Sequence, residues 1–284
     1  MIAPRWPALT RQLIAELSST ISAAGAAILA ARRACLNVRA KADESPVTSA
    51  DHASEAVMLE GIARLLPGVP VISEEAGCAH LSISGMFVLI DPLDGTRELL
   101  AGRDEFTINL AIIEGGRPQL GIIAAPARGL VWQGIVGAGA ERLRLAAGEP
   151  ASAARDRVDI RTRPCPRSGL VALVSRSHLD AKTEALLARL PLARRAACGS
   201  AIKFCLLAQG EADIYPRLST TCEWDIAAGE AIIRAAGGLM TAPAGSDLVY
   251  GRIDREFRVP GFIAWGDPRR ATLLDDGGRT TDDG

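Results

Sequence analysis

The stretch GMFVLIDPLDGTREL, residues 85–99, joins an apolar run to two aspartates, a glycine and a threonine. The apolar run has the length and composition of a buried strand. Pro92 predicts the end of that strand, because proline has no N–H to donate to a β-ladder. Gly95 then permits a tight turn. The stretch therefore predicts that Asp91 and Asp94 lie together at the mouth of a buried strand.

Two carboxylates at this spacing repel each other unless a cation neutralises them or one of them takes up a proton. Hard divalent cations such as Mg²⁺ bind carboxylate and backbone carbonyl oxygens. The turn offers both kinds of oxygen, from Asp91, from Asp94 and from the carbonyl group of Leu93. An ordinary Asp-Gly turn is the alternative, because that pair is common in turns. The whole hexapeptide DPLDGT favours a metal site.

Other acidic residues also stand at the ends of predicted elements. Glu74 and Glu75 follow the short predicted strand VPVIS, where a solvated loop is the alternative. Asp225 precedes a predicted helix, and its alternative role is the N-cap. Asp51 lies three residues after Thr48, as in a capping box. Each position has an ordinary explanation alone, and their joint occurrence predicts a functional site.

Hydrophobic periodicity predicts a layered α+β / α/β protein made of two packed halves. In the first half, which we expect to be mostly antiparallel, the periodicity predicts helices at about 9–33 and 58–66, a strand at 86–90 and a hairpin of strands at 106–114 and 118–127. In the second half it predicts strands at 170–175 and 212–216 and helices at 181–190, 200–209 and 226–236.

A polar, proline-bearing segment at residues 150–166 marks the division between the halves. We expect residues 1–155 to carry most of the metal ligands. Residues 156–284 are then expected to carry the substrate-binding residues and Asp225.

The composition predicts a soluble globular protein with a small-molecule partner. The 284 residues carry a net charge of −1, without the basic excess of a protein that binds nucleic acid. Residues 1–33 have the pattern of an amphipathic helix rather than a signal peptide. No other segment has the ~18 uninterrupted apolar residues that a transmembrane span needs. The six scattered cysteines include no C-x-x-C pair, so we expect reduced thiols and a cytoplasmic protein.

Several motifs together carry a resemblance to a known family. They are KADESPVTSAD, SEE, DPLDGTREL, EFTINLAII, SRSH, GSAIKFCLLAQGEADIYPRL and EWDIAAGEA, in this order along residues 5 to 265. This combination resembles the Mg²⁺-dependent, Li⁺-sensitive inositol monophosphatase superfamily. Within it, the chain is most similar to the bacterial 3′(2′),5′-bisphosphate nucleotidases.

The resemblance implies a sandwich of alternating α-β-α-β-α layers. It implies hydrolysis of the 3′-phosphate of adenosine 3′,5′-bisphosphate, or of its sulfated precursor, in nucleotide recycling during sulfur assimilation. It also implies two or three Mg²⁺ ions, inhibition by Li⁺, and a monomer or homodimer without a nucleic-acid partner. The expected location is the cytoplasm, or the inner face of the bacterial inner membrane as a peripheral protein.

The resemblance also assigns roles to single residues. It implies metal ligands at Glu74, Asp91, Leu93 (carbonyl), Asp94 and Asp225. It implies that Asp51 and Thr96 position the attacking water. It implies substrate contacts at Gly95, Thr96, His178, Ser200, Lys203 and Arg217.

Physical chemistry supports a two-metal phosphatase. Two metal ions ~3.5–4 Å apart can neutralise phosphoryl oxygens, activate a water and stabilise the leaving oxygen. A threonine hydroxyl that is bonded to Asp51 can accept a proton from a water whose pKa a metal has lowered. Ser200 and Lys203 are three residues apart at the start of a predicted helix, so we expect them to share a face. The alternatives are a surface role for Lys203 and His178, and a rim position for Arg217.

The chain departs from the family pattern in three places. Ala201 and Ile202 replace the common serine and leucine, LLAGR at 99–103 lacks a phenylalanine and an asparagine, and FRVPGFIAW at 257–265 replaces an Asn-Pro stretch. The rival activities are inositol monophosphatase and sugar bisphosphatase. A non-catalytic regulatory or binding protein is the alternative of another class.

Overall fold

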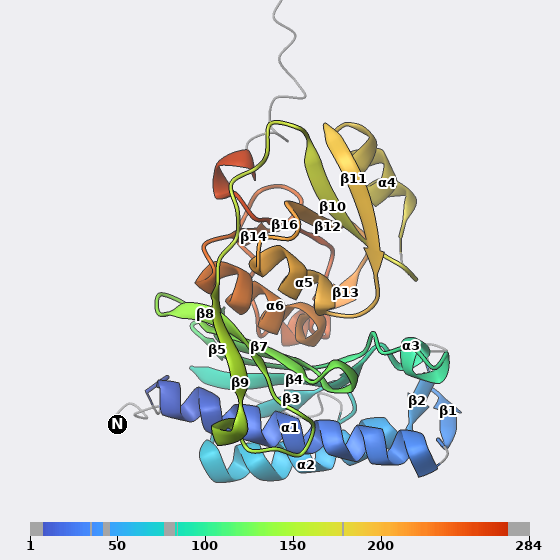
Figure 1. The fold of residues 1–284 in the computed structure, drawn as a ribbon, viewed down its shortest axis with the longest axis vertical. Coiled ribbons are helices and arrows are strands. Elements are labelled where there is room, and N and C mark those ends of the chain that lie inside the picture. The colour runs from blue at the N-terminus through green and yellow to red at the C-terminus, as the bar shows by residue number, and fades with distance from the viewer. Residues whose placement is uncertain are drawn as a thin grey trace, which may run out of the picture.

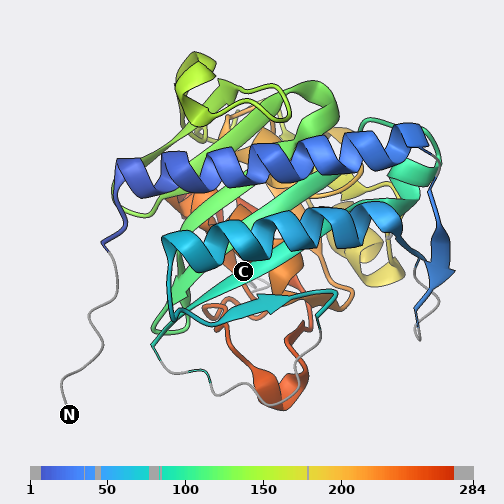
Figure 2. The same ribbon diagram turned by 90° about the horizontal axis from the view of Figure 1, so that it is seen from below.

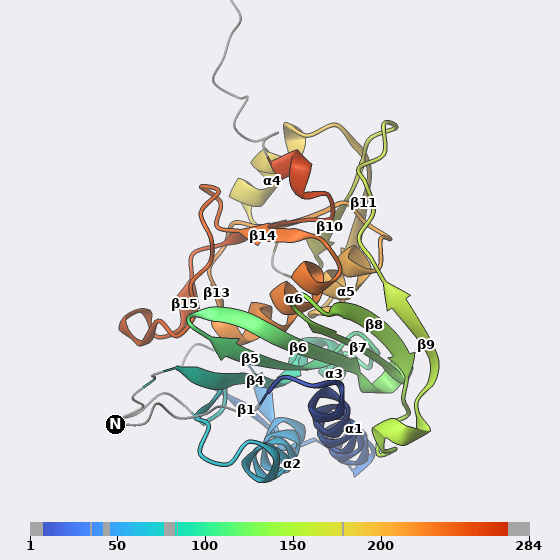
Figure 3. The same ribbon diagram turned by 90° about the vertical axis from the view of Figure 1, so that its left-hand side faces the viewer.

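Five alternating layers of helices and sheets make up the computed structural model, which describes residues 8–34, 36–41, 46–76, 83, 85–177 and 179–271. Figure 1 shows the layers stacked from bottom to top: two long helices, a seven-stranded sheet, two helices, a five-stranded sheet and one outer helix. Figure 3 shows the same order from the side. This α-β-α-β-α arrangement confirms the predicted fold class.

The larger sheet has its strands in chain order, and only its first pair is parallel. Its strands are β3 (Val71–Ser73), β4 (Met86–Asp94), β5 (Thr107–Glu114), β6 (Arg117–Ala125), β7 (Leu130–Ile135), β8 (Gly139–Arg144) and β9 (Arg155–Ile160). The predicted hairpin at Gly115–Gly116 is confirmed by the pairing of β5 with β6.

The smaller sheet mixes parallel and antiparallel pairs. Its order is β11 (Leu192–Cys198), β10 (Leu170–Ser175), β12 (Ile214–Arg217), β16 (Phe262–Trp265) and β14 (Leu239–Thr241). Two short ladders lie outside both sheets: β1 (Val38–Ala40) with β2 (Pro46–Thr48), and β13 (Thr221–Cys222) with β15 (Arg258–Val259).

The helices fill the remaining layers. They are α1 (Arg11–Ala34), α2 (Ser49–Leu65), α3 (Thr96–Leu100), α4 (Ala181–Ala188), α5 (Ile202–Ala208) and α6 (Glu223–Ala235), with short 3₁₀ helices at η1 (Pro126–Arg128), η2 (Ala151–Ala153) and η3 (Ile253–Arg255). Figure 2 shows α1 and α2 side by side across the outer face of the larger sheet. Helices α5 and α6 lie between the two sheets (Figure 1).

Helix α1 is long and apolar enough to cross a membrane, which is weak evidence because core helices pass the same test. Leu17, Ile21 and Ile28 are fully buried among residues of α2 and the larger sheet. The Ser18 hydroxyl also donates to Gln133 Oε1 of β7 over 2.5 Å. These contacts are those of a core helix.

Alternation along β4 decides which residues face the site. Met86, Val88 and Ile90 pack in the core beneath α1 and α2. Phe87 and Leu89 pack on the opposite face, in the core with α5 and α6. Because side chains alternate across a strand, Asp91 follows on the same face as Leu89.

Helix α6 lies unusually close to the larger sheet because small residues line the contact. A Cβ atom on Gly121 of β6 would lie only 2.3 Å from the backbone oxygen of Ala228. A Cβ atom on Gly134 of β7 would lie 2.9 Å from the Cβ of Ala235. The glycines therefore let α6 seat on the sheet and fix the position of its first turn, which carries Asp225.

The structure differs from the sequence expectations in several elements. The helix predicted at about 58–66 begins nine residues earlier, at Ser49, because the capping box of Thr48 and Asp51 starts it. The sequence pattern does not predict β11, β14 or β16 of the smaller sheet. The strand predicted to end at Pro92 continues to Asp94, because the chain bulges there instead of leaving the sheet. The helix predicted at 200–209 begins only at Ile202. The division of the chain at 155/156 stays a proposal, and strand pairing carries the larger sheet on to Ile160.

Candidate active site

A bulge in β4 places Asp91 and Asp94 on one face of the larger sheet. Asp91 pairs with Asn109 on β5, and Asp94 pairs with Thr107. Three steps along β4 therefore match two steps along β5, so both aspartates share the face of their partners. Pro92 suits the bulge because it has no N–H to pair. Without the bulge, strict alternation would send the two carboxylates to opposite faces.

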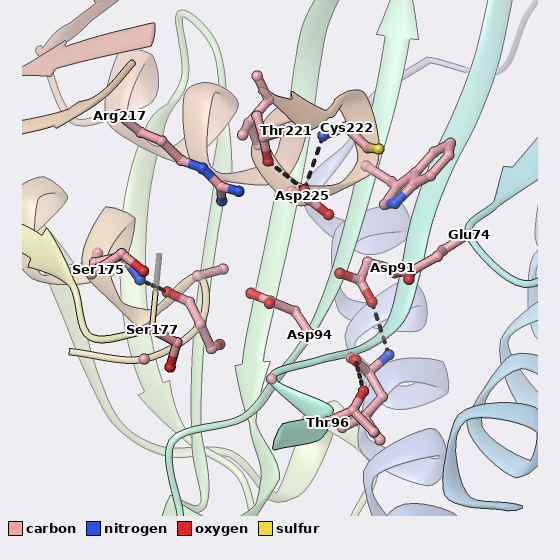
Figure 4. A pocket seen from close by; sticks show the side chains of 18 of the residues that line it. Glu74, Asp91, Asp94, Thr96, Ser175, Ser177, Arg217, Thr221, Cys222 and Asp225 are labelled. Carbon is pink, nitrogen blue, oxygen red and sulfur yellow. Dashed lines mark hydrogen bonds between the residues drawn. The ribbon is translucent and has the colours of Figure 1, made fainter. Parts of the chain in front are cut away.

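Three carboxylates from separate elements converge at this bulge. Glu74 follows β3, and its N–H donates to the carbonyl of Ile90 over 3.3 Å, which sets it beside Asp91. One carboxylate oxygen each from Glu74, Asp91 and Asp225 lies within 4.8 Å of the other two. Figure 4 shows these side chains and Asp94 around one cavity.

The first turn of α6 fixes Asp225. The backbone N–H of Cys222 donates to Asp225 Oδ2 over 3.0 Å, and the Thr221 hydroxyl donates to the same oxygen. Asp225 thus occupies the third helical position of a capping box and is not the N-cap itself. Its other carboxylate oxygen is left to face the cavity (Figure 4).

Burial and mutual repulsion hold protons on this cluster. Burial, with the nearby Asp225 charge, raises the pKa of Glu74 from 4.5 to about 7, although Lys41 opposes the shift. Burial raises the pKa of Asp91 well above its ordinary value, and Glu74 and Asp94 add to the rise. Burial and the Asp225 charge also raise the pKa of Asp94. The protein without a cation therefore pays an electrostatic cost to ionise these acids near neutral pH.

Lys41 is the charged partner that sequence reasoning did not assign. Its ammonium group lies 2.7 Å from Glu74 Oε1 and 2.6 Å from Glu75 Oε1. Burial lowers the pKa of Lys41, but the Glu74 and Glu75 carboxylates outweigh that effect and the net shift is upward. Lys41 opens the motif KADESPVTSAD, so its position was a signal available in the sequence.

Asp51 holds Thr96 at the edge of the cluster. Thr48 donates its backbone N–H and its hydroxyl to Asp51 Oδ2 over 2.8 and 2.7 Å, which completes the capping box of α2. The Thr96 hydroxyl lies 3.2 Å from Asp51 Oδ1 and 3.3 Å from the carbonyl oxygen of Leu93. Asp51 therefore completes the capping box of α2, as the sequence pattern predicts. It also orients the Thr96 hydroxyl.

Hydrogen bonds from two separate segments hold Asp94. The Ala201 N–H and the Ser200 hydroxyl hydrogen-bond to its carboxylate. The Thr107 hydroxyl reaches Asp94 Oδ2 over 3.4 Å and lies 2.6 Å from the Ser200 hydroxyl. Asp94 is thus held by residues from β5 and from the segment that leads into α5.

Lys203 is buried rather than a surface lysine. Its ammonium group donates to the carbonyl oxygens of Ser200 over 2.6 Å and Cys198 over 3.2 Å, and it lies 5.2 Å from the centroid of the Tyr215 ring. Ser200 precedes α5 in the left-handed region, with φ of 56°. The expectation that Ser200 and Lys203 share a helical face is therefore wrong, because Ser200 lies outside the helix and Lys203 turns back to hold it.

A cavity of about 450 Å³ joins these groups. Residues of both halves line it, including Gly95, Thr96, Ser200, Lys203, Arg217 and Asp225. Gly95 has φ of 95°, and a Cβ atom there would lie 3.0 Å from the carbonyl oxygen of Glu105, so only glycine fits this turn. Of the residues predicted from the sequence, His178 lies outside the described residues.

The donor set fits a hard divalent cation. The convergent groups are carboxylates, and the carbonyl group of Leu93 belongs to the same turn. Beneath them, both polar atoms of the buried Asn109 side chain have no hydrogen-bond partner among the described residues. An amide opposite Asp91 is well placed to hydrogen-bond to a ligating carboxylate or to a water.

The chain matches known proteins in sequence and in fold. A model of the inositol monophosphatase family matches residues 10–264. The 3′(2′),5′-bisphosphate nucleotidase CysQ of Escherichia coli strain K12 is 37% identical over 230 residues, 80% of this chain and 88% of that protein. The crystal structure of CysQ from Bacteroides thetaiotaomicron, a bacterial member of the inositol monophosphatase family, has a TM-score of 0.75 and 28% identity and covers 90% of this chain and 97% of that one. An IMPase/NADP phosphatase complexed with Mg²⁺ and phosphate shares the fold, with a TM-score of 0.74, 17% identity and 95% coverage of each chain.

We predict that removing divalent cations makes stability fall with pH. Burial and the Asp225 charge raise the pKa of Glu74 to about 7. The folded chain therefore holds a proton that the unfolded chain loses at lower pH, so stability falls as pH rises from the unfolded to the folded pKa. Melting curves in EDTA should show a lower Tm at pH 8 than at pH 5. Mg²⁺ at a hundred times its Kd should raise the free energy of unfolding by about 2.7 kcal/mol. The rise in Tm should be larger at pH 8 than at pH 5.

Glu74→Gln is the matched control for this experiment. The variant removes the titrating carboxyl group and its negative charge. Its Tm in EDTA should therefore vary less with pH, and its Tm should rise less when Mg²⁺ is added. Equal stabilisation of the variant and the wild type by Mg²⁺ would contradict the placement of the cation at this cluster.

Proposed function

The chain belongs to the inositol monophosphatase family, and on that basis we propose that it is a Mg²⁺-dependent phosphatase that removes the 3′-phosphate from adenosine 3′,5′-bisphosphate. The proposed substrate is inferred from the 37% identity to the Escherichia coli 3′(2′),5′-bisphosphate nucleotidase over 80% of this chain. The convergence of Glu74, Asp91 and Asp225 supports a metal-assisted hydrolysis and not a non-catalytic binding role.

Each acidic residue then has a defined task. Glu74, Asp91, Asp94, Asp225 and the carbonyl of Leu93 would hold Mg²⁺. When bound, Mg²⁺ supplies charge neutralisation for the phosphoryl oxygens and lowers the pKa of a coordinated water. The raised pKa values of Glu74 and Asp91 mean that these residues release protons when they bind a cation.

Thr96 and Asp51 orient the attacking water. The Thr96 hydroxyl has one proton to donate and two lone pairs. Since its proton is directed to Asp51 or to the carbonyl of Leu93, a lone pair is free to accept a hydrogen bond from the water. Asp51 is buried and fixed by Thr48, so it holds the hydroxyl in this orientation.

The opposite wall of the cavity receives the rest of the substrate. Arg217 extends toward the cavity in Figure 4, where a guanidinium group suits a phosphate. Ser200 reaches the cavity directly, while Lys203 shapes it by holding Ser200 and adds positive charge beneath the phosphoryl group. Gly95 leaves room for the phosphate to approach the backbone. His178 completes the proposed substrate contacts.

Other properties belong to the same proposal. The protein would bind two or three Mg²⁺ ions, be inhibited by Li⁺, and act as a monomer or homodimer in the cytoplasm or at the inner face of the membrane. Its metal ligands would come mostly from residues 1–155, and its substrate contacts, apart from Gly95 and Thr96, from residues 156–284.

A phosphate-release panel tests the proposed activity. We expect purified protein to release phosphate from adenosine 3′,5′-bisphosphate in the presence of Mg²⁺, to lose this activity in EDTA and to be inhibited by Li⁺. Inositol 1-phosphate and a sugar bisphosphate serve as the comparison substrates. A higher kcat/KM for either of them would contradict the nucleotide assignment and favour the rival activities.

Replacement of Thr96 tests the orientation of the water. Thr96→Ala removes the hydroxyl that Asp51 holds, so kcat should fall about 10²- to 10⁴-fold, while the Mg²⁺ concentration for half-maximal activity changes little. Thr96→Ser keeps the hydroxyl and should keep most of the rate. A variant Thr96→Ala that loses its Mg²⁺ response but keeps kcat would show that Thr96 serves the metal and not the water.

A further inference from the structure

Two arginines line the cavity close to Asp225, and one of them has no role in the activity described above. Arg217 ends β12 and Arg258 begins β15. We propose that Arg258 binds, together with Arg217, the phosphate group of the substrate that is not removed, and so determines specificity for a bisphosphate. The inference rests on the proposed function, because it presumes that the other phosphate lies at the acidic cluster.

Strand pairing directs Arg258 toward the cavity. Strand β15 runs antiparallel to β13, and Arg258 is the direct partner of Cys222. Direct partners in an antiparallel pair project their side chains on the same face. Cys222 lines the cavity and lies three residues before Asp225. Arg258 therefore emerges beside the segment that fixes the acidic cluster.

Arg217, at the end of β12, contacts the segment that leads to Cys222. Its guanidinium group donates to the carbonyl oxygen of Thr220 over 3.3 Å and to the Ser219 hydroxyl over 3.4 Å. Arg217 therefore contacts residues 219–220, and Arg258 pairs with Cys222 of the same segment, which leads into the helix that carries Asp225.

The turn that carries Arg258 is pinned to the start of α6. The Glu223 carboxylate accepts the backbone N–H groups of Gly251 over 2.6 Å and Arg252 over 2.9 Å. The Glu223 N–H in turn donates to the carbonyl oxygen of Phe257 over 2.8 Å. Phe257 is fully buried, with φ of 57°. Because Glu223 stands two residues before Asp225, one buried carboxylate sets Arg258 in register with the acidic cluster.

The ion pairs of the cavity leave Arg258 available to an anion. Lys41 is paired with Glu74 and Glu75. Arg258 pairs only loosely with Glu256, at 3.7 Å, and their side chains are 58% and 83% exposed. An exposed pair of this kind contributes little, whereas a phosphate offers a guanidinium group two charge-assisted hydrogen bonds.

A nucleoside bisphosphate matches this arrangement of charges. One of its phosphates is the group to be hydrolysed and needs the cation held by the acids. The other keeps its negative charge throughout the reaction and needs a protein cation at a fixed distance from the first. Two arginines suit it better than lysines because their planar groups bind phosphate oxygens in pairs.

The test compares a bisphosphate with a monophosphate on the Arg258→Leu variant. We expect the ratio of kcat/KM for adenosine 3′,5′-bisphosphate to kcat/KM for adenosine 3′-monophosphate to fall about 10- to 100-fold, mainly through KM for the bisphosphate. The inhibition constant of adenosine 5′-monophosphate, which keeps the second phosphate, should rise by a similar factor. Inhibition by inorganic phosphate should change much less, because that ion can bind to the cation held by the acidic cluster without Arg258.

Two further variants complete the experiment. Arg258→Lys should recover part of the specificity ratio, since it restores the charge without the planar group. Arg255→Ala removes an exposed arginine of the same turn that does not line the cavity, and it should behave as the wild type. A wild-type chain that does not hydrolyse the bisphosphate would contradict the proposed function. An active wild type whose specificity ratio and inhibition constants are unaltered by Arg258→Leu would overturn the inference about Arg258 alone.

Discussion

Repulsion among carboxylates is the constraint on which the rest of this structure depends. Glu74, Asp91 and Asp225 bring oxygens within 4.8 Å of one another in a largely buried setting. Burial and like charge raise the pKa values of Glu74 and Asp91, so the arrangement costs stability unless a cation or protons neutralise it. A fold keeps such a cluster only if its elements hold each carboxylate in place. The bulge in β4, the capping box of α6 and the Lys41 ion pairs do this here.

The site forms where elements from distant parts of the chain meet. The larger sheet supplies Asp91 and Asp94, while α6 supplies Asp225. Asp94 is held by Ser200 and Ala201, which precede α5. The close seating of α6 on the sheet, through glycines such as Gly121, sets the distance between the acids from the two halves. The packing between the layers therefore also determines the geometry of the carboxylate cluster.

Much of this could be predicted from the sequence, because the signals are local. The apolar runs, the glycine hairpin and the acids at element ends predicted a layered fold and an acidic metal site. The order of the five layers and the roles of Thr96, Ser200 and Arg217 came from the resemblance to the inositol monophosphatases. The bulge could not be predicted, since it depends on the register between β4 and β5. The burial of Lys203 and the conformation of Ser200 depend on contacts between distant segments. Arg258 was missed for the same reason, because its place in the cavity comes from pairing with Cys222.

The proposed activity depends on the binding of a divalent cation at the cluster of carboxylates. Crystals grown with Mn²⁺ in place of Mg²⁺ test it most directly, because Mn²⁺ takes similar oxygen ligands and scatters anomalously. We expect an anomalous peak within bonding distance of oxygens from Glu74, Asp91 and Asp225. Crystals that show no anomalous peak at these three residues, with Mn²⁺ well above the concentration that supports activity, would contradict it.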